Sequence, residues 1–260
     1  MADRCRMQNA DMDGSAFFWP GNSTGILLIH GFTATTVEVR PLAEYFRRAG
    51  FSVAGPLLPG HNTSPEDLNQ RLWQEWAAAA DQGYQMLQST CKSVFVGGES
   101  LGGLLAFQLA SLHPEASGVL AYSPALRVKN IRRARFARFF ISIMAKRSNG
   151  KSTEPLPWQG YTAYPVKAAY QMYRFQQYVE PRLKRVAQPT LILQGEKDRT
   201  IDPNSSQIIF DAISSPRKEL VWMKNSGHCI ILDQEYELVM SRSLSFVQSI
   251  LQSKGYPVFK

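Results

Sequence analysis

Short runs of apolar residues recur along the chain, separated by stretches in which apolar residues repeat every three or four positions. These runs predict six β-strands, the last of them the least regular: Thr24–His30, Phe51–Ala54, Ser93–Gly97, Gly118–Tyr122, Thr190–Gln194 and Leu220–Met223. Most of the runs are continuous and do not alternate with polar residues. This pattern is typical of strands that are buried on both faces of a parallel sheet.

The stretches between the strands predict helices over five ranges: Pro41–Ala49, Pro65–Leu87, Leu101–Leu112, Ser205–Ala212 and Glu235–Leu251. The helix expected from Pro65 has a typical start, because Ser64 can cap it and acidic residues follow in its first turn. Strands that alternate with helices of this length indicate an α/β fold with a doubly wound, mostly parallel sheet.

Residues 125–188 interrupt this alternation with a stretch that is helical, aromatic and basic. The stretch holds fourteen Lys or Arg against only Glu154 and Glu180, whereas the whole chain carries +8. The basicity therefore belongs to one segment, which marks that segment as an insertion. We expect a core formed by residues 20–124 and 189–252, a cap formed by residues 125–188, and terminal segments at 1–19 and 253–260.

The composition fits one domain with an insertion, because 260 residues with 44% hydrophobic content can fill a large core. No apolar run reaches 18 residues and residues 1–14 lack a signal-peptide pattern, so we expect a cytoplasmic protein. Cys5, Cys91 and Cys229 show neither a disulfide framework nor metal-ligand spacing. No nucleic-acid recognition motif accompanies the basic segment, so a nucleic-acid partner is not expected.

Residues 94–105 carry the strongest chemical signal in the chain. An apolar strand runs into Gly98-Glu99-Ser100-Leu101-Gly102, and an apolar helix starts directly behind it. This arrangement is typical of the nucleophile elbow, G-x-S-x-G, whose strained turn lifts the serine hydroxyl above the sheet. Gly98 and Gly102 are needed there because a Cβ at either position would collide with the turn. Ser100 is therefore the predicted nucleophile.

A serine hydroxyl is a poor nucleophile until a neighbouring base takes its proton, so a histidine must accompany Ser100. On folds with this elbow the catalytic groups follow the chain order serine, acid, histidine. Of the four histidines, only His228 comes late enough in the chain to complete that order.

The acid is expected in the loop after the Thr190–Gln194 strand, where Glu196, Asp198 and Asp202 are available. Asp198 is the preferred candidate, because it stands a few residues beyond the strand end. Asp202 is expected to cap the helix that follows. The acid would hold the imidazole of His228 in the required tautomer and stabilise its protonated form.

Attack on a carbonyl group produces an oxyanion, which preorganised backbone N–H groups stabilise. One expected donor is the N–H of Leu101, directly after the nucleophile. The other should come from the loop after the first strand, His30-Gly31-Phe32-Thr33, where the N–H of Phe32 is preferred. His30 is expected to order this loop by hydrogen bonding and to transfer no proton.

Five motifs occur in the order and spacing of a known family: His30-Gly31-Phe32-Thr33, Pro59-Gly60-His61, Gly98-Glu99-Ser100-Leu101-Gly102-Gly103, Gly195-Glu196-Lys197-Asp198 and Ser226-Gly227-His228. From about Gly25 to Phe246, outside the cap, the chain resembles the bacterial monoacylglycerol lipases and the Bacillus-type thermostable carboxylesterases of the α/β-hydrolase superfamily. The resemblance implies an α/β-hydrolase fold with a helical cap. It also implies hydrolysis of short- to medium-chain acyl esters or monoacylglycerols through an acyl-serine intermediate, with no metal and no organic cofactor. It puts Ser100, Asp198 and His228 on the triad positions.

Two alternatives stay open at this point. The triad alone does not separate ester hydrolysis from other serine chemistry on the same fold, such as that of a thioesterase, a C–C hydrolase, a peptidase or an acyltransferase. A different class of function is a lipid-surface-binding protein that acts through its basic cap.

The run Arg132–Phe140 in the cap departs from the family pattern. Phe136, Phe139 and Phe140 share one helical face, and the arginines lie largely elsewhere. One interpretation is a basic amphipathic helix that docks on an anionic lipid surface. The other is a lid helix that packs its aromatic residues on the core and leaves its arginines in solvent. Basic residues near the site could also attract acidic substrates.

Overall fold

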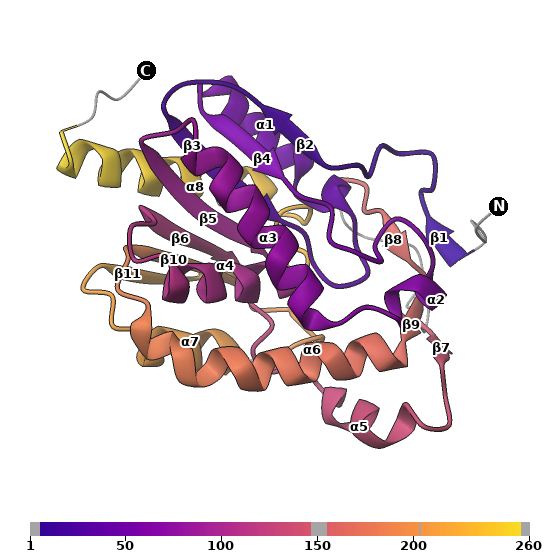
Figure 1. The fold of residues 1–260 in the computed structure, drawn as a ribbon. Coiled ribbons are helices and arrows are strands. Elements are labelled where there is room, and N and C mark those ends of the chain that lie inside the picture. The colour runs from indigo at the N-terminus through magenta and orange to yellow at the C-terminus, as the bar shows by residue number, and fades with distance from the viewer. Residues whose placement is uncertain (1–5, 147–154, 203, 256–260) are drawn as a thin grey trace.

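The computed structural model describes residues 6–146, 155–202 and 204–255. Residues 1–5, 147–154 and 256–260, which belong to the expected terminal segments and cap, lie outside the described residues. A seven-stranded sheet runs through the molecule in the order β11-β10-β6-β5-β3-β4-β2 (Figure 1). Its strands are β2 (Phe17–Trp19), β3 (Thr24–Ile29), β4 (Ser52–Gly55), β5 (Ser93–Glu99), β6 (Gly118–Tyr122), β10 (Thr190–Gly195) and β11 (Lys218–Met223).

Neighbouring strands of the sheet pair in parallel, except that β2 runs antiparallel to β4 at one edge. The predicted mostly parallel α/β sheet is therefore confirmed. The edge strand β2 was not predicted, because three residues that are not fully buried give too short a pattern to be distinguished from a loop.

Helices cover both faces of the sheet (Figure 1). They are α1 (Arg40–Arg48), α2 (Pro65–Leu68), α3 (Trp73–Gln88), α4 (Leu101–Leu112), α5 (Ala134–Ala137), α6 (Val166–Val179), α7 (Ser205–Ala212) and α8 (Tyr236–Ser253). Successive side chains of a strand point to opposite faces, so Ile26 and Leu28 of β3 pack with α1 and α8, whereas Leu27 and Ile29 pack with α3 and α4. Two hydrophobic cores result, one on each face.

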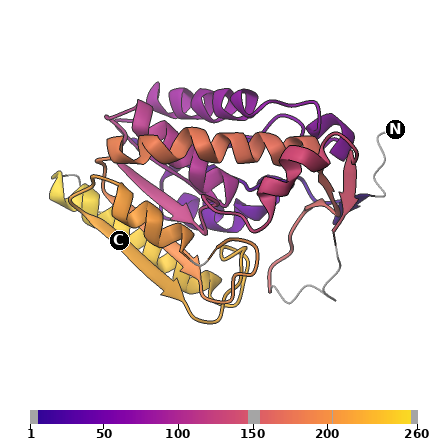
Figure 2. The same cartoon turned by 90° about the horizontal axis from the view of Figure 1, so that it is seen from below.

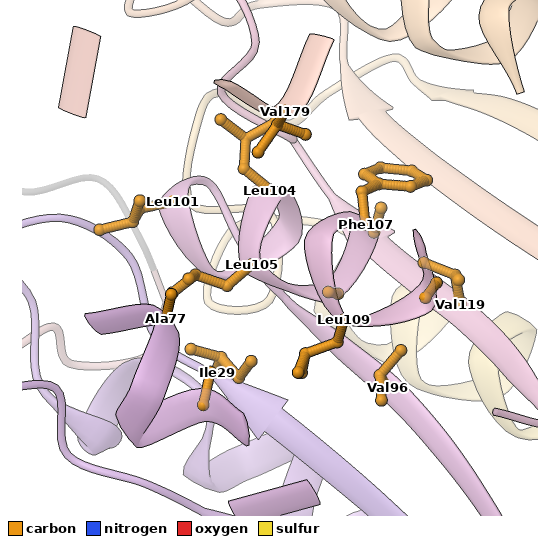
Figure 3. Packing of buried hydrophobic residues seen from close by; sticks show 14 of the residues in the cluster. Ile29, Ala77, Val96, Leu101, Leu104, Leu105, Phe107, Leu109, Val119 and Val179 are labelled. Carbon is orange, nitrogen blue, oxygen red and sulfur yellow. The ribbon is translucent and has the colours of Figure 1, made fainter. Parts of the chain in front are cut away.

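Helix α4 is enclosed by apolar side chains on almost every side. Ten of its twelve residues are buried. Leu105 lies beside Ala77 of α3 and Ile29 of β3, whereas Leu104 lies beside Val179 of α6 (Figure 3). Because α4 follows β5 directly, this packing fixes the turn that joins them.

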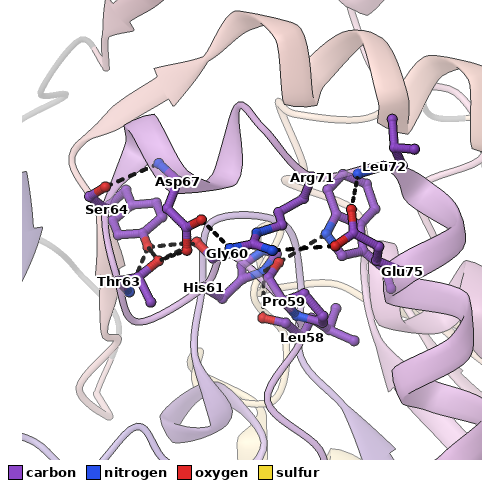
Figure 4. Close-up of polar contacts among 12 residues, drawn as sticks. Leu58, Pro59, Gly60, His61, Thr63, Ser64, Asp67, Arg71, Leu72 and Glu75 are labelled. Carbon is purple, nitrogen blue, oxygen red and sulfur yellow. Dashed lines mark hydrogen bonds and ion pairs between the residues drawn. The ribbon is translucent and has the colours of Figure 1, made fainter.

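The helix predicted over Pro65–Leu87 forms as two helices, α2 and α3. Ser64 caps α2 as predicted, with its Oγ accepting a hydrogen bond from the N–H of Asp67 at 3.1 Å. Arg71 lies in the break and forms ion pairs with Asp67 of α2 and Glu75 of α3 (Figure 4). The prediction of one continuous helix was wrong because these local charges stabilise a turn that the spacing of apolar residues does not reveal.

The segment between β6 and β10 contains α5, α6 and three short strands. β7 (Ile143–Ala145) pairs with β9 (Ala163–Pro165), and β8 (Gly160–Tyr161) pairs with β1 (Met7–Gln8) near the start of the chain. Helix α6 packs against α3 and α4 and runs along the outside of the α/β layers (Figure 2). No helix within the described ranges is long and apolar enough to cross a membrane.

The outer face of this segment exposes its aromatic residues. Phe136, Phe139 and Phe140 are 68%, 69% and 88% exposed. The interpretation in which these rings pack on the core is therefore wrong. The residues that face inward are others, because Ala134 is buried and the guanidinium of Arg138 stacks 3.8 Å from the ring centre of Tyr170 on α6.

Candidate active site

Ser100 occupies the turn between β5 and α4. Its backbone has φ 55° and ψ −108°, a conformation that is strained for any residue with a side chain. Two backbone hydrogen bonds hold the turn: the N–H of Ser100 donates to the carbonyl of Tyr122 at 2.8 Å, and the N–H of Ala125 donates to the carbonyl of Ser100 at 3.1 Å. The neighbouring strand β6 and the loop after it thus hold the strained residue in place.

The two glycines of the elbow are required by contact with β3. A Cβ at Gly98 would lie 2.4 Å from the carbonyl oxygen of Ile29, and a Cβ at Gly102 would lie 1.9 Å from the same atom. The predicted steric need for glycine is therefore confirmed, although the colliding group is the adjacent strand as well as the turn itself.

Three side chains from separate loops meet beyond the carboxyl ends of the strands. Ser100 follows β5, Asp198 follows β10 and His228 follows β11. His228 Nε2 lies 2.9 Å from Ser100 Oγ, and His228 Nδ1 lies 2.7 Å from Asp198 Oδ2. This geometry allows the imidazole to accept the serine proton while the carboxylate holds the ring in position.

Asp198 is held by a dense set of donors. Its Oδ1 accepts from the N–H of Thr200 at 2.7 Å and of Ile201 at 3.1 Å, and its Oδ2 accepts from Gln194 Nε2 at 3.1 Å. Burial raises the pKa of Asp198, but the charge and hydrogen bond of His228 and these backbone donors outweigh burial and keep the pKa below its usual value. Sequence reasoning missed Gln194. The signal that could have identified it is its position as a polar residue at the end of an apolar strand.

Two acids fix the loop that carries His228. Asp233 Oδ2 accepts from the N–H of Gly227 at 2.5 Å, and Glu235 Oε2 accepts from the hydroxyl of Ser226 at 2.8 Å. Both acids lie just after His228 in the sequence, so the loop is closed by local contacts and the imidazole needs little reorganisation.

The predicted oxyanion donors lie at the start of α4 and in the loop after β3. The N–H groups of Leu101 and Phe32 donate to no acceptor within the part of the chain that the structure describes. His30 Nε2 accepts from the N–H of Leu58 at 3.1 Å, and its Nδ1 lies 2.9 Å from the carbonyl of Gly31. Burial lowers the pKa of His30 to about 4, so the ring is neutral and bonded on both sides, as an ordering role requires.

A family described as Serine aminopeptidase, S33, matches residues 22–235 of the chain. The chain belongs to this family of α/β hydrolases. It is 33% identical over 235 residues to the thermostable monoacylglycerol lipase of Bacillus sp. (strain H-257), and the aligned region covers 88% of this chain and 92% of that protein. It is 27% identical over 237 residues to the carboxylesterase of Bacillus subtilis (strain 168), and that aligned region covers 90% of this chain and 96% of the carboxylesterase.

Solved structures agree with the family assignment. A metagenome-derived lipolytic enzyme, described in work on LipS and LipT, matches this α/β hydrolase with a TM-score of 0.86 and 31% sequence identity. The match covers 91% of this chain and 98% of that one. The resemblance inferred from the sequence motifs is therefore confirmed.

Sequence reasoning missed Glu38, a buried carboxylate of this hydrolase behind the loop that carries the predicted oxyanion donor Phe32. Its Oε2 accepts from the N–H of Gly31 at 2.6 Å, and its Oε1 accepts from Trp158 Nε1 at 3.0 Å. Burial raises the pKa of Glu38, and these donors act in the opposite direction. One carboxylate thus joins the oxyanion loop to the segment between β6 and β10.

Glu99 is a second buried carboxylate, directly before Ser100 in the elbow. Its Oε2 accepts from the N–H of Ile231 at 3.3 Å, while its Oε1 has no partner among the described residues. Burial raises the pKa of Glu99 well above its usual value, and the charge of Glu38 adds to the effect. Within the described ranges, no group of three or more His, Cys, Asp or Glu could hold a metal ion.

Proposed function

We propose that this α/β hydrolase cleaves carboxylic esters, namely short- to medium-chain acyl esters or monoacylglycerols, through an acyl-serine intermediate. The observation that supports this most strongly is the hydrogen-bonded chain from Ser100 through His228 to Asp198. The names of the two Bacillus relatives support ester cleavage. The family description names an aminopeptidase instead, a chemistry that the same triad can serve.

In the first half of the reaction, His228 accepts the proton of Ser100 as Oγ attacks the carbonyl carbon of the ester. The N–H groups of Phe32 and Leu101 stabilise the negative oxygen of the tetrahedral intermediate. The bond to the alcohol oxygen then breaks, and His228 gives its proton to the departing alcohol. Asp198 stabilises the imidazolium while it exists.

In the second half, a water molecule takes the position of the departed alcohol. His228 accepts a proton from this water as the oxygen attacks the acyl carbon of acyl-Ser100. The second tetrahedral intermediate collapses, the bond to Ser100 Oγ breaks, and the proton returns from His228 to the serine. The carboxylic acid then leaves.

We assign residues 125–188 to a cap that limits access to Ser100. Three contacts support this assignment. Trp158 donates to Glu38 at 3.0 Å, Gly160 forms a β-bridge with Ala34, and the hydroxyl of Tyr161 donates to the carbonyl of Gly60 at 2.8 Å. The cap therefore rests on the loops that follow β3 and β4, at the same end of the sheet as the triad.

The test of the proposed reaction is Ser100→Ala with a substrate panel of p-nitrophenyl butyrate, monoolein, butyryl-CoA and an aminoacyl anilide. Wild-type protein should hydrolyse the first two best, and Ser100→Ala should lose at least about 10⁴-fold in kcat with its thermal unfolding unchanged. Near wild-type turnover by the variant, or preferred cleavage of the anilide or of the thioester, would contradict the proposal.

A second function is supported by the exposed aromatic face of the cap. Phe139 and Phe140 project into solvent, and Arg132, Arg133 and Arg135 of the same segment are exposed and positively charged. Exposed aromatic side chains enter the boundary between headgroups and acyl chains, and basic side chains are attracted to anionic headgroups. We infer that this face docks the hydrolase on an anionic lipid surface.

Sedimentation with vesicles tests the docking. Wild-type protein should bind phosphatidylcholine vesicles that contain phosphatidylglycerol, bind pure phosphatidylcholine more weakly, and lose most of the difference in 1 M salt because of screening. A double variant, Phe139→Ser with Phe140→Ser, should lose binding. The matched control is Leu112→Ser, which alters a 48% exposed apolar residue on α4 instead. Equal binding by all three proteins would exclude a role of the aromatic face.

A further inference from the structure

Lys146 reaches from the cap into the neighbourhood of the oxyanion loop. It follows β7 directly, and its backbone N–H donates to the carbonyl of Thr162 at 3.0 Å. Its Nζ lies 2.7 Å from the Oγ1 of Thr33, the residue after the predicted oxyanion donor Phe32. A cation from the cap thus contacts the loop that is proposed to stabilise the negative oxygen of the tetrahedral intermediate.

The described residues around Lys146 leave part of its hydrogen-bonding capacity unused. An ammonium group has three donors, and among the described residues Thr33 is the single hydrogen-bond acceptor of Nζ. The rings of Trp158 and Tyr164 lie 4.8 Å and 5.0 Å from Nζ and supply only cation–π contacts. No carboxylate of the described ranges lies within ion-pair distance of Nζ. A largely buried charge in such a setting favours an anionic ligand.

We propose that Lys146 binds an anionic group, a phosphate or a carboxylate, carried by the alcohol portion of the ester substrate. The proposal rests on the ester hydrolysis proposed above and names the substrate class for that same site. The alcohol portion is chosen because His228 must give its proton to the departing alcohol. Cys229, directly after His228, donates through Sγ to Glu38 Oε1 at 3.7 Å. The same oxygen accepts from Trp158, whose ring lies 4.8 Å from Nζ of Lys146. Lys146 is therefore near both Thr33 and the residue after the base.

Electrostatics keep this cation available at neutral pH. Burial lowers the pKa of Lys146 to about 8, while Cys229 and Glu38 act in the opposite direction. Lys146 in turn contributes to the lowered pKa of His61, and the ring of Tyr164 lies 5.0 Å from its Nζ. Within the described ranges, the titratable groups around Lys146 are therefore Cys229, Glu38, His61 and Tyr164. The ammonium is charged below about pH 8 and becomes neutral as the pH rises through that value.

Matched butyryl esters of glycerol, glycerate and glycerol 3-phosphate test the proposal, because substrates with short acyl chains do not form micelles. Lys146→Met should lower the ratio of kcat/KM on the phosphate or carboxylate ester to kcat/KM on the neutral ester by about tenfold to a hundredfold. The change should be in KM, because a charge that binds substrate and transition state alike leaves kcat nearly constant.

Three controls make the result specific. Lys167→Met removes an exposed charge of the cap outside the site and should leave the ratio within about twofold. Lys146→Arg should retain the preference for anionic esters. Glycerol monosuccinate, which carries its charge on the acyl side, should show a smaller effect of Lys146→Met than the glycerate ester. If Lys146→Met affected glycerol monosuccinate as strongly as the glycerate ester, Lys146 would not be specific for a charge on the alcohol portion, and the proposal would be contradicted.

The pH dependence of wild-type protein supplies a test that needs no variant. The preference for the phosphate ester over the neutral ester should fall as the pH rises from 7 through about 8, whereas Lys146→Arg should keep its preference to higher pH. Glycerol 3-phosphate should also inhibit wild-type protein at pH 7 more strongly than glycerol does, and lose this advantage above pH 9. If the ratio of kcat/KM on the phosphate ester to kcat/KM on the neutral ester did not change with pH while the neutral ester was still hydrolysed, the role of Lys146 would be overturned. Ester hydrolysis itself would not be contradicted. Absence of turnover on every ester would instead overturn the proposed function.

Discussion

Helix α4 and the cap segment 131–141 have similar apolar spacing but opposite surroundings. In α4, Leu104, Leu105 and Leu109 are fully buried between the sheet and the helices that cover it. In the cap segment, Phe139 and Phe140 are 69% and 88% exposed. Helical spacing therefore reports which side chains share a face. It does not report whether the protein itself covers that face.

The charged residues explain the difference between the two regions. The range Leu101–Leu112 has no charged residue, so the helix can be enclosed on all sides. In the cap segment, Arg132, Arg133 and Arg135 precede Phe136, and Arg138 lies between Phe136 and Phe139. Burial of several charges without ion-pair partners would be costly. The segment therefore stays at the surface, where its aromatic face is available for the proposed docking on a lipid surface.

The largest effect is expected at Asp198, a buried group that acts through His228 on Ser100, the residue directly before α4. Asp198→Asn removes the charge that orients His228, and kcat should fall by about 10⁴-fold because the imidazole adopts the wrong tautomer. Stopped-flow and steady-state assays on p-nitrophenyl butyrate measure the loss. Asp202→Asn is the matched control, since its Oδ1 accepts from the N–H of Asn204 and lies outside the triad. Similar losses in both variants would contradict the assignment of the acid.

A core truncation in α4 should have the next largest effect. Leu105→Ala removes buried methyl groups between α3 and β3 and should lower the free energy of unfolding by about 2–5 kcal/mol. Urea unfolding followed by circular dichroism measures the change. A loss below about 1 kcal/mol would mean that α4 is far less tightly packed than described.

Replacement of the buried carboxyl group of Glu99, directly before Ser100, should stabilise the fold. The folded-state pKa of Glu99 is raised well above 4.5 by burial, so folding loses stability as the pH rises from 4.5 toward the raised value. Glu99→Gln removes this loss, so the free energy of unfolding of the variant should exceed that of wild type at pH 8.

The gain from Glu99→Gln should shrink as the pH falls toward 4.5, because Glu99 is then protonated in both folded and unfolded chains. Urea unfolding at pH 5 and pH 8 compares the two conditions. Glu219→Gln, on an exposed position of β11, should show no such pH dependence. A destabilised Glu99→Gln at pH 8 would show that the carboxylate is ionised and stabilised in the folded protein.

The exposed side of the comparison should give the smallest change in stability. Phe140→Ala removes a ring that is 88% exposed, and the free energy of unfolding should change by less than about 0.5 kcal/mol. The same urea assay as for Leu105→Ala makes the two values directly comparable. A loss of 2 kcal/mol or more would show that another part of the chain covers this face.

The sequence predicted the parts of the fold that repeat a simple pattern. The strands from β3 to β11 of the main sheet and the helices α1, α4, α7 and α8 were predicted to within a few residues, because each has a clear apolar period or run. The break between α2 and α3 was not predicted, because it depends on the ion pairs of Arg71 with Asp67 and Glu75. Those ion pairs become apparent only once the turn exists.

The candidate site divides in the same way. Ser100, Asp198 and His228 were selected from motifs and chain order, and His228 lies within hydrogen-bond distance of both other residues. The supporting residues belong to no motif. Glu38 lies only seven residues after Gly31, but no motif marks it as the acceptor of that N–H. Lys146 reaches Thr33 from a distant part of the chain, and only tertiary packing brings it there.

The pairing of β1 with β8 has a consequence for anyone who alters the amino terminus. Gln159, just before β8, donates through Nε2 to the carbonyls of Asn9 and Met12 at 2.9 Å and 2.7 Å, and Asn9 donates to the carbonyl of Trp158 at 2.6 Å. We expect a truncation that removes Asn9 and Met12 to weaken the attachment of the cap and so to change turnover, without touching a reacting group. The end of α8 lies on the opposite side of the molecule (Figure 1), which makes it the safer place for purification handles or immobilisation linkers.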